Sequence, residues 1–309
     1  ANAVKELVIL ALLISSRPVI SANLWTETLK GKGAEVATLA EKGKNQFIGQ
    51  EIKGKTLGVI GLGAIGAQVA NTAVELGMNV IGYDPFLSID AAWNLNRLVR
   101  HAETLDTLLS KADYITVHVP ETPDTKGLIN ASTIKNMKDG VRIINIARGG
   151  LVNNEELLSA ISSGKIACLV TDFAAEELLG NEKVICLPHL GASTPEAEEN
   201  CAVMAVRQLR DFLEHGNITN SVNFPHCKLE EAIPHGGTRL CISNKNVAGV
   251  VSKFTSVLGD ASFNIASMIN QNRNDLAYNL IDVDGKVDDE TIAKLGNIEG
   301  VINVRPIYA

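Results

Sequence analysis

Three glycines, Gly61, Gly63 and Gly66, stand within one short apolar stretch, GVIGLGAIGAQVA. The residues before them, 55–60, have the apolar pattern of a buried strand, and residues 64–77 have helical spacing and end at a glycine. In this order of elements, backbone N–H groups of the turn can approach a pyrophosphate at the positive end of the helix dipole. The stretch therefore predicts an α/β fold with a dinucleotide site; a tight structural turn is the alternative for the pattern taken alone.

A carboxylate ends the next predicted strand. The strand NVIGYD stops at Asp84, where an acid in this motif accepts both hydroxyls of an adenosine ribose and repels a 2′-phosphate. No arginine follows in YDPFLSID to bind that phosphate, so the sequence favours NAD over NADP as the cofactor. The alternative for Asp84 is a turn residue before Pro85.

Composition excludes several classes of partner. At 309 residues, with 46% apolar and 20% charged residues, the chain suits a packed protein of two domains. The net charge of −7 argues against nucleic acid or an anionic membrane surface as a general partner. The apolar stretch ELVILALLISS is too short to span a bilayer and predicts a buried or interface helix instead.

The cysteines and histidines indicate neither disulfides nor a metal. The five cysteines, an odd number without C-x-x-C spacing, are typical of reduced thiols in the cytoplasm. The six histidines lack the spacing of metal ligands. We therefore expect a cytoplasmic protein without a bound metal.

Strand and helix patterns alternate after the glycine-rich turn. Short runs that are apolar on both faces follow NVIGYD: YITVHVP, VRIINIA, IACLVTD and VICLPH. Together with the first two strands they predict a six-stranded, doubly wound parallel sheet of the Rossmann type. A long helix is expected over residues 193–216, and the dinucleotide-binding domain is expected to span residues 1–216.

A linker and a smaller domain are predicted to follow. Residues 217–237 contain two prolines and end in paired glycines, so we expect the linker there. Residues 238–309 then have the patterns of strand, helix, strand, strand, helix and strand. This βαββαβ order predicts a small α+β domain, in which an antiparallel sheet carries helices on one face.

Three polar residues follow the later strands of the predicted sheet. Arg148, Glu177 and His189 stand at or just after the carboxyl ends of strands, where ligands bind in open parallel sheets. Hydride transfer involving a hydroxy acid uses a cation that holds the substrate carboxylate, a proton donor or acceptor, and an acid that tunes it. Taken singly, each residue has a structural alternative: a helix-capping cation, a solvated acid beside Glu176, and a buried core histidine.

Several motifs resemble those of one known family. GVIGLGAIG, HVPETPDTKGLIN, INIARGGLVN, TDFAAEE and LPHLGAST are similar, as a set, to the D-isomer-specific 2-hydroxyacid dehydrogenases. The resemblance is strongest to the branch that oxidises D-3-phosphoglycerate and carries a C-terminal ACT domain. It implies that Arg148 orients the substrate carboxylate, that His189 exchanges a proton with the substrate oxygen, and that Glu177 raises the pKa of the histidine.

The same resemblance implies which residues line the NAD site. Asp172 is expected to hold the nicotinamide carboxamide, and Asp84 is expected to hold the adenosine ribose. The remaining expected cofactor residues are Gly61, Gly63, Ala64, Ile65, Gly66, Val119, Ala147, Gly191 and Ala192.

The sequence also departs from the family. Ala64 replaces a usual arginine, so one pyrophosphate contact is expected to be missing. The segment between Glu177 and His189 is short and lacks the usual proline, which leaves Glu176 as a second candidate for the acid. Relatives open with a substrate-binding half that this sequence does not include, so we expect a truncated form that binds NADH and turns over little. The helix at residues 4–14 resembles one that commonly packs between subunits, which implies a homodimer or homotetramer.

The tail resembles an ACT domain, which implies an amino-acid effector with serine as the first candidate. Asn246 and Asn264 match positions at which relatives bind the effector. Asn244 and Ala248 replace the usual histidine and proline of that loop. A dimerising domain without a ligand is therefore the alternative.

The resemblance as a whole implies a function in serine biosynthesis. The expected reaction is the NAD-dependent oxidation of D-3-phosphoglycerate to 3-phosphohydroxypyruvate, so the expected substrate is a phosphorylated 2-hydroxy or 2-oxo acid. A hydroxypyruvate or glyoxylate reductase of the same family is one alternative. An NAD-sensing binding protein without turnover is another.

Overall fold

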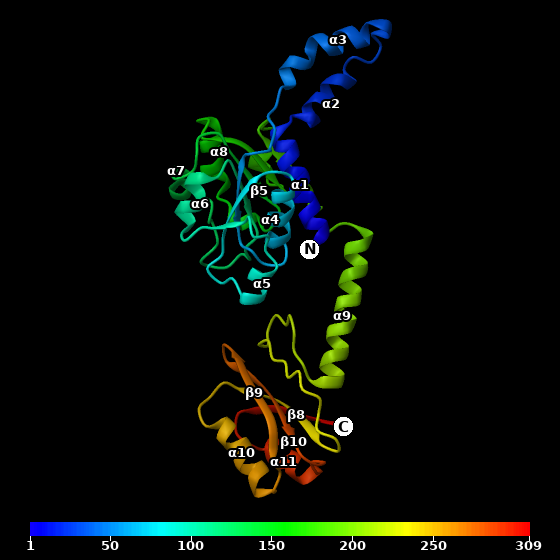
Figure 1. The fold of residues 1–309 in the computed structure, drawn as a ribbon, viewed down its shortest axis with the longest axis vertical. Coiled ribbons are helices and arrows are strands. Elements are labelled where there is room, and N and C mark those ends of the chain that lie inside the picture. The colour runs from blue at the N-terminus through cyan, green and yellow to red at the C-terminus, as the bar shows by residue number, and fades with distance from the viewer. The chain divides into compact units, whose positions relative to one another are not determined.

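The computed structural model describes residues 1–309 apart from the side chain of Asp90. The chain divides into two compact units, Ala1–Glu198 and Glu199–Ala309 (Figure 1). Helix α9 (Pro195–His215) crosses this boundary, and the predicted linker 217–237 belongs to the second unit. The division therefore falls earlier along the chain than the predicted domain end at residue 216.

The first unit contains a seven-stranded sheet in the order β3-β2-β1-β4-β5-β6-β7, and every pair of neighbours is parallel. The order reverses between β1 and β4, which makes the sheet doubly wound, as predicted. Six strands match the predicted runs, and the seventh, β3, is a short edge strand that the sequence analysis missed. The strands are β1 (Thr56–Ile60), β2 (Asn79–Tyr83), β3 (Arg100–His101), β4 (Tyr114–Val117), β5 (Val141–Asn145), β6 (Ile166–Thr171) and β7 (Val184–Cys186).

Helices cover both faces of this sheet, which explains why its central strands are apolar on both sides. One core cluster joins the sheet to α6, α7 and α8, and the other joins it to α1 and α4. The helices and 3₁₀ turns after the glycine loop are α4 (Gly66–Glu75), α5 (Ile89–Trp93), α6 (Leu105–Lys111), α7 (Ala131–Lys135), η3 (Gly149–Leu151), α8 (Asn154–Ser162) and η4 (Glu176–Leu178).

Helix α1 (Asn2–Ser16) packs onto the sheet of its own chain. Val8, Ala11 and Leu12 are fully buried in the cluster shared with α4. Leu10 and Leu13 are the large apolar side chains of α1 that remain exposed. The sheet of the same chain covers the main apolar face of α1, which confirms the buried alternative of the sequence prediction, and packing of α1 between subunits stays a prediction.

Residues 17–49 form a protruding segment, which we call the arm. It contains α2 (Val19–Glu27), η1 (Gly33–Glu35), α3 (Val36–Gly43) and η2 (Lys44–Phe47). Among the described residues, none of these four elements contributes to a core cluster. Figure 1 shows α2 and α3 extending from the end of α1 away from the sheet. The two ends of the arm meet, since the N–H of Gln50 donates to the carbonyl of Ser16 at 3.1 Å.

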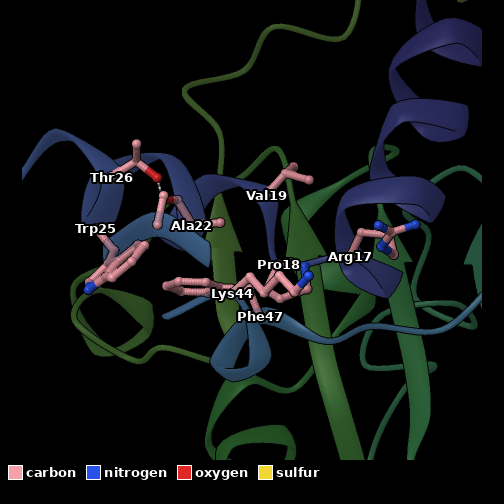
Figure 2. Close-up of a pocket in the computed structure, with 9 residues that line it drawn as sticks. Arg17, Pro18, Val19, Ala22, Trp25, Thr26, Lys44 and Phe47 are labelled. Carbon is pink, nitrogen blue, oxygen red and sulfur yellow. Dashed lines mark hydrogen bonds between the residues drawn. The ribbon is translucent and has the colours of Figure 1, made fainter. Parts of the chain in front are cut away.

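Within the arm, α2 and η2 enclose a shallow pocket of about 310 Å³ (Figure 2). The rings of Trp25 and Phe47 pack against each other there, with centroids 5.4 Å apart.

Among the described residues, no single helix is long and apolar enough to cross a membrane; α1 and α2 reach that length only together, with a bend of 67° between them.

The second unit has the predicted βαββαβ order. Its antiparallel sheet has the order β11-β8-β10-β9, and α10 and α11 cover one face with a core that includes Phe254, Leu258 and Leu295. The elements are β8 (Thr238–Lys245), α10 (Val250–Asp260), β9 (Ile265–Arg273), β10 (Leu276–Val283), α11 (Asp289–Gly296) and β11 (Val301–Tyr308). Helix α9 begins as predicted, because the Thr194 hydroxyl accepts the N–H of Ala197 at 3.1 Å.

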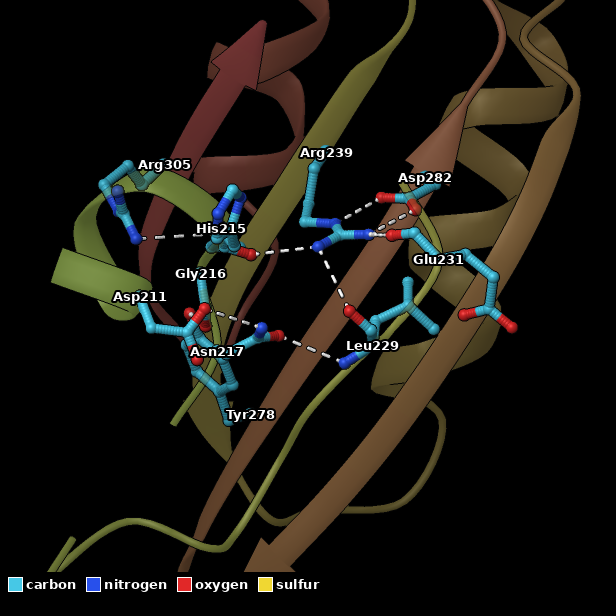
Figure 3. Close-up of polar contacts among 11 residues, drawn as sticks. Asp211, His215, Gly216, Asn217, Leu229, Glu231, Arg239, Tyr278, Asp282 and Arg305 are labelled. Atoms are coloured by element: carbon cyan, nitrogen blue, oxygen red, sulfur yellow. Dashed lines mark hydrogen bonds and ion pairs between the residues drawn. The ribbon is translucent and has the colours of Figure 1, made fainter. Parts of the chain in front are cut away.

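A buried ion pair fixes the linker to this sheet (Figure 3). Arg239 of β8 donates from Nε and Nη2 to the two carboxylate oxygens of Asp282 of β10, each at 2.7 Å. The same guanidinium donates to the carbonyls of His215, Leu229 and Glu231 at 3.1, 3.4 and 2.8 Å. We call these five residues the Arg239 cluster. It holds the end of α9 and the linker against β8 and β10.

Candidate active site

The three glycines of the β1–α4 turn serve different purposes. Gly61 has φ 90°, and a Cβ there would lie 2.8 Å from the carbonyl carbon of His118. A Cβ on Gly66 would lie 1.9 Å from the carbonyl oxygen of Gly61, so this glycine allows α4 to approach β1 closely. A Cβ on Gly63 would meet nothing within 4 Å, so the turn is open at that point. Two glycines are needed by the fold, and the third leaves backbone accessible to a ligand.

The amino end of α4 is available for an anion. Ile65 is the N-cap residue, and no side chain of the described residues caps the helix there. The first N–H groups of a helix have no partner within the helix, and they carry the positive end of its dipole. This arrangement fits a pyrophosphate at the turn.

Asp84 lies at the carboxyl end of β2, beside the glycine turn. Its Oδ2 accepts the N–H of Leu62 at 2.8 Å, and its Oδ1 accepts the N–H of Phe86 at 2.9 Å. These bonds fix the carboxylate while each oxygen keeps a further lone pair for a ribose hydroxyl. The position therefore fits the ribose-binding role that the sequence predicts.

A cavity of about 270 Å³ lies at the carboxyl ends of β4, β5 and β6. This is the edge of a doubly wound sheet at which ligands bind. The cavity brings Arg148 and His189 together with most of the predicted cofactor residues. Its lining consists of Val4, Ile65, His118, Val119, Pro120, Ile146, Ala147, Arg148, Asp172, His189, Gly191 and Ala192.

His189 sits on a turn that Asp172 organises. The carboxylate of Asp172 is almost fully buried, and its two oxygens accept the N–H groups of Leu190 and Gly191, each at 2.7 Å. His189 itself has φ 58°, an uncommon conformation for a residue other than glycine, and its ring packs on Phe173 with centroids 5.2 Å apart. The backbone bonds to Asp172 thus hold the imidazole at the cavity.

Arg148 follows β5 and reaches the same cavity. Its Nη1 donates to the carbonyl of Ala147 at 2.6 Å, which orients the guanidinium and leaves its other N–H groups for an anionic ligand. The neighbouring glycines are tightly placed, because a Cβ on Gly150 would lie 2.2 Å from Oε1 of Glu121.

Glu177 is not brought to His189. It is exposed on η4, and its Oε1 accepts a hydrogen bond from the side-chain amide of Asn154 at 2.8 Å. That bond lowers the pKa of the Glu177 carboxyl below its usual value. Neither Glu177 nor Glu176 is among the residues that line the cavity.

The sequence analysis missed the lining residues Val4, Pro120 and Ile146 and two ring side chains of the site. His118 lines the cavity, and Phe173 supports the ring of His189. A signal for His118 was present, because a polar residue directly after the apolar strand YITV stands at the ligand-binding edge of a parallel sheet. No comparable signal marked Phe173, since an aromatic residue after a strand is usually part of the core.

The two predicted effector residues lie far apart in the second unit. The amide of Asn246 donates to the carbonyl of Asn274, just beyond the carboxyl end of β9. The amide of Asn264 donates to Oδ2 of Asp284, just before the amino end of β9. One copy of the unit therefore does not bring both side chains to one site.

Comparison with known proteins places the chain in a family. Residues 20–191 match the D-isomer specific 2-hydroxyacid dehydrogenase, NAD binding domain. The D-3-phosphoglycerate dehydrogenase of Haemophilus influenzae is 34% identical over 319 residues, which cover 99% of this chain and 73% of that enzyme. The chain belongs to the D-isomer specific 2-hydroxyacid dehydrogenase family. The D-3-phosphoglycerate dehydrogenase of Synechocystis is 45% identical over 188 residues, which cover 59% of this chain and only 33% of that enzyme.

Solved structures of the 2-hydroxyacid dehydrogenase family agree with the fold. A glyoxylate reductase from Paecilomyes thermophila has a TM-score of 0.60 at 27% identity, covering 72% of this chain and 65% of its own. A D-lactate dehydrogenase from Aquifex aeolicus, complexed with NAD and lactic acid, has a TM-score of 0.56 at 27% identity, covering 68% and 66%. The α/β fold and NAD as the cofactor, both predicted from the sequence, are confirmed.

Proposed function

We propose that this protein oxidises D-3-phosphoglycerate to 3-phosphohydroxypyruvate with NAD, a reaction of serine biosynthesis. The observation that carries the proposal is that Arg148 and His189 line the same cavity as Val119, Ala147 and Asp172 of the NAD site. The relatives named D-3-phosphoglycerate dehydrogenase support the choice of substrate, since one of them aligns with 99% of this chain.

NAD supplies the acceptor for a hydride from C2 of the hydroxy acid. The guanidinium of Arg148 binds the substrate carboxylate and orients C2, because its free N–H groups form the planar fork that carboxylates prefer. His189 takes the proton of the substrate hydroxyl as the hydride leaves, and returns it in the reverse direction. Asp172 keeps the imidazole in place through its bonds to Leu190 and Gly191.

Glu177 remains our candidate for the acid that supports protonated His189, with Glu176 as the alternative. Both are exposed on η4, in the segment between β6 and the turn of His189. In the structure the Glu177 carboxylate accepts a hydrogen bond from the side-chain amide of Asn154. To support protonated His189, the carboxylate would give up this bond and accept one from the imidazolium instead. A charge-assisted bond is the stronger of the two, which favours that exchange once His189 is protonated.

We also propose that the second unit binds serine through Asn246 and Asn264 and that the protein is a homodimer or homotetramer. Because the two asparagines lie at opposite ends of β9, a site that uses both takes one from each of two copies. Calorimetry with serine should show saturable binding that Asn246→Ala abolishes. Absence of heat at millimolar serine would favour a dimerising domain without a ligand.

A glyoxylate or hydroxypyruvate reductase is the second candidate function. The fold similarity to the glyoxylate reductase from Paecilomyes thermophila favours it, because that relationship covers 72% of this chain. The two candidates share the cofactor and the roles of Arg148 and His189, and they differ in the substrate phosphate.

The test combines a binding assay with a substrate panel, both applied to the purified protein. NADH binding is followed by fluorescence titration, and turnover is measured with D-3-phosphoglycerate, glyoxylate and hydroxypyruvate. Arg148→Ala and His189→Asn should keep NADH affinity within about threefold and lower kcat/KM by at least about 100-fold. Arg210→Ala, which removes an exposed arginine of α9, is the matched control. Preference for glyoxylate over D-3-phosphoglycerate would select the second candidate.

A further inference from the structure

His118 is an ionisable residue of the cavity to which neither the sequence motifs nor the proposed reaction gives a role. It follows β4 directly, and its N–H donates to the carbonyl of Ile60, the last residue of β1, at 2.7 Å. Its backbone also lies against Gly61, where a Cβ would come within 2.8 Å of it. The position of His118 is thus locked to the glycine turn.

A buried hydroxyl determines which ring nitrogen of His118 carries the proton. Nε2 lies 2.9 Å from Oγ1 of Thr116, and Thr116 is fully buried. Among the described residues the Thr116 hydroxyl has no other hydrogen-bond partner, so its proton goes to Nε2. In the neutral imidazole this assigns the proton to Nδ1. Burial keeps the ring neutral at physiological pH, since it lowers the pKa of His118 to about 4.

The Nδ1–H of His118 has no protein acceptor among the described residues. Every fully buried side-chain nitrogen or oxygen of the described residues has a partner, so Nδ1 is not one of the fully buried atoms. The opening that His118 borders is the cavity at the ends of β4, β5 and β6. The side chain therefore offers this cavity one hydrogen-bond donor without a charge.

The place of His118 in the cavity indicates which part of NAD it meets. His118 follows β4, and one neighbour of β4 in the sheet is β1, which leads into the glycine turn and Ile65, where the pyrophosphate fits. The other neighbour of β4 is β5, which leads to Arg148, and Arg148 lines the cavity together with Asp172 and His189 of the proposed reaction. The part of NAD between a pyrophosphate and a nicotinamide is a ribose.

We propose that the Nδ1–H of His118 binds an oxygen of the ribose that carries the nicotinamide, and that His118 is a positioning residue for the reactive ring. The proposal rests on the cofactor site of the proposed function. A fixed donor at this ribose limits rotation of the nicotinamide over Arg148 and His189, and small displacements of reacting atoms cost large factors in rate. The absence of charge suits a site that holds both the cationic oxidised ring and the neutral reduced ring.

Two amide variants of His118 distinguish the roles of the two ring nitrogens. In His118→Asn the amide nitrogen takes the place of Nδ1, so a donor to the ribose is retained. In His118→Gln the amide reaches the place of Nε2, so contact with Thr116 is retained and the ribose donor is lost. Both variants are polar and uncharged, which makes each the control for the other.

Binding of NADH, ADP-ribose and ADP to these variants shows which part of NAD His118 contacts. ADP-ribose contains the second ribose without the nicotinamide, and ADP contains neither. We expect His118→Gln to weaken both NADH and ADP-ribose by about five- to tenfold and to leave ADP unchanged, as the loss of one hydrogen bond implies. His118→Asn should stay within about twofold of the unchanged protein for all three. In the turnover assay, kcat should fall in His118→Gln while KM for the hydroxy acid stays near its original value.

Other outcomes would overturn the proposal in identifiable ways. Equal weakening of all three ligands would mean that His118 acts on the pyrophosphate or on the fold, and weakening of NADH alone would mean a contact to the nicotinamide. No change in either variant would mean that the donor has no acceptor on NAD. If the unchanged protein did not bind NADH, the cofactor site of the proposed function would fail first, and ADP-ribose binding would show which part of it failed.

Discussion

Replacement of Arg239 by methionine should destabilise the second unit strongly. Methionine retains much of the apolar stem of the arginine, but it removes the cation from a carboxylate that is fully buried on Asp282. It also removes the donor for three backbone carbonyls of the Arg239 cluster. Breaking a buried ion pair by removing one partner costs about 3–5 kcal/mol. That is a large part of the 5–15 kcal/mol by which a typical domain is stable.

Urea unfolding can measure this cost one unit at a time. Both tryptophans, Trp25 and Trp93, lie in the first unit, so tryptophan fluorescence reports that unit and circular dichroism reports both. A loss of about 4 kcal/mol with a slope of about 2 kcal/mol per molar urea lowers the midpoint of the second unit by about 2 M. The transition followed by tryptophan fluorescence should not move in Arg239→Met.

Two controls make the reasoning refutable. Lys294→Met breaks the exposed pair with Glu290 on α11, at 2.8 Å, and should leave the urea midpoint of the second unit nearly unchanged. The double variant Arg239→Met with Asp282→Leu should be more stable than Arg239→Met alone, since no unpaired charge is left in the core. If Arg239→Met cost no more than Lys294→Met, water would have to reach the Arg239 cluster in solution, and the argument from burial would be wrong.

Further predictions concern the first unit. Asp84→Ala should weaken NADH at least about tenfold and narrow its advantage over NADPH in fluorescence titration, because the ribose acceptor is lost. Gly66→Ala places a Cβ 1.9 Å from a carbonyl oxygen, so a lower melting temperature and loss of NADH binding are expected. Glu177→Gln should move the acid limb of the pH–rate profile to lower pH; an unchanged profile that moves in Glu176→Gln would reassign the role. The pKa of His118 is lowered to about 4, so the folded chain binds fewer protons than the unfolded chain, and stability falls as the pH drops from about 6.5 to 4. Urea midpoints across that range should change less in His118→Asn.

The sequence predicted the central sheet well because each of its main strands is buried on both faces. Runs such as IACLVTD have too many apolar residues for a surface strand and too few residues for a helix. The edge strand β3 has only two residues, both exposed, so no apolar pattern marks it. The sequence predicted α1 as a helix, but it could not predict which element packs against the apolar face of α1. Periodicity shows which face of a helix is buried and not what covers it.

The candidate site was predictable where backbone position determines the residue. Arg148 and His189 follow strands of a parallel sheet, and the carboxyl ends of such strands meet at one edge. The link between Glu177 and His189 depends instead on side-chain rotamers and on a competing partner, Asn154, from another element. The hydrogen bonds that Asp172 accepts from Leu190 and Gly191 could not be predicted either, because motif spacing does not reveal which backbone N–H groups donate to a carboxylate.

The hydrogen bonds among Ser16, Gln50 and Tyr114 at the base of the arm make this segment a separable part of the chain. The Tyr114 hydroxyl lies 2.7 Å from Oγ of Ser16 and accepts the amide of Gln50 at 2.8 Å, so the residues on either side of the arm are tied to β4 as well as to each other. Changes of length between these anchors are confined to backbone that the sheet does not use, which is the condition under which insertions and deletions are tolerated. Related chains can therefore lengthen, shorten or recompose the arm, and with it whatever surface it presents, without altering the strand register that holds the cofactor site in place.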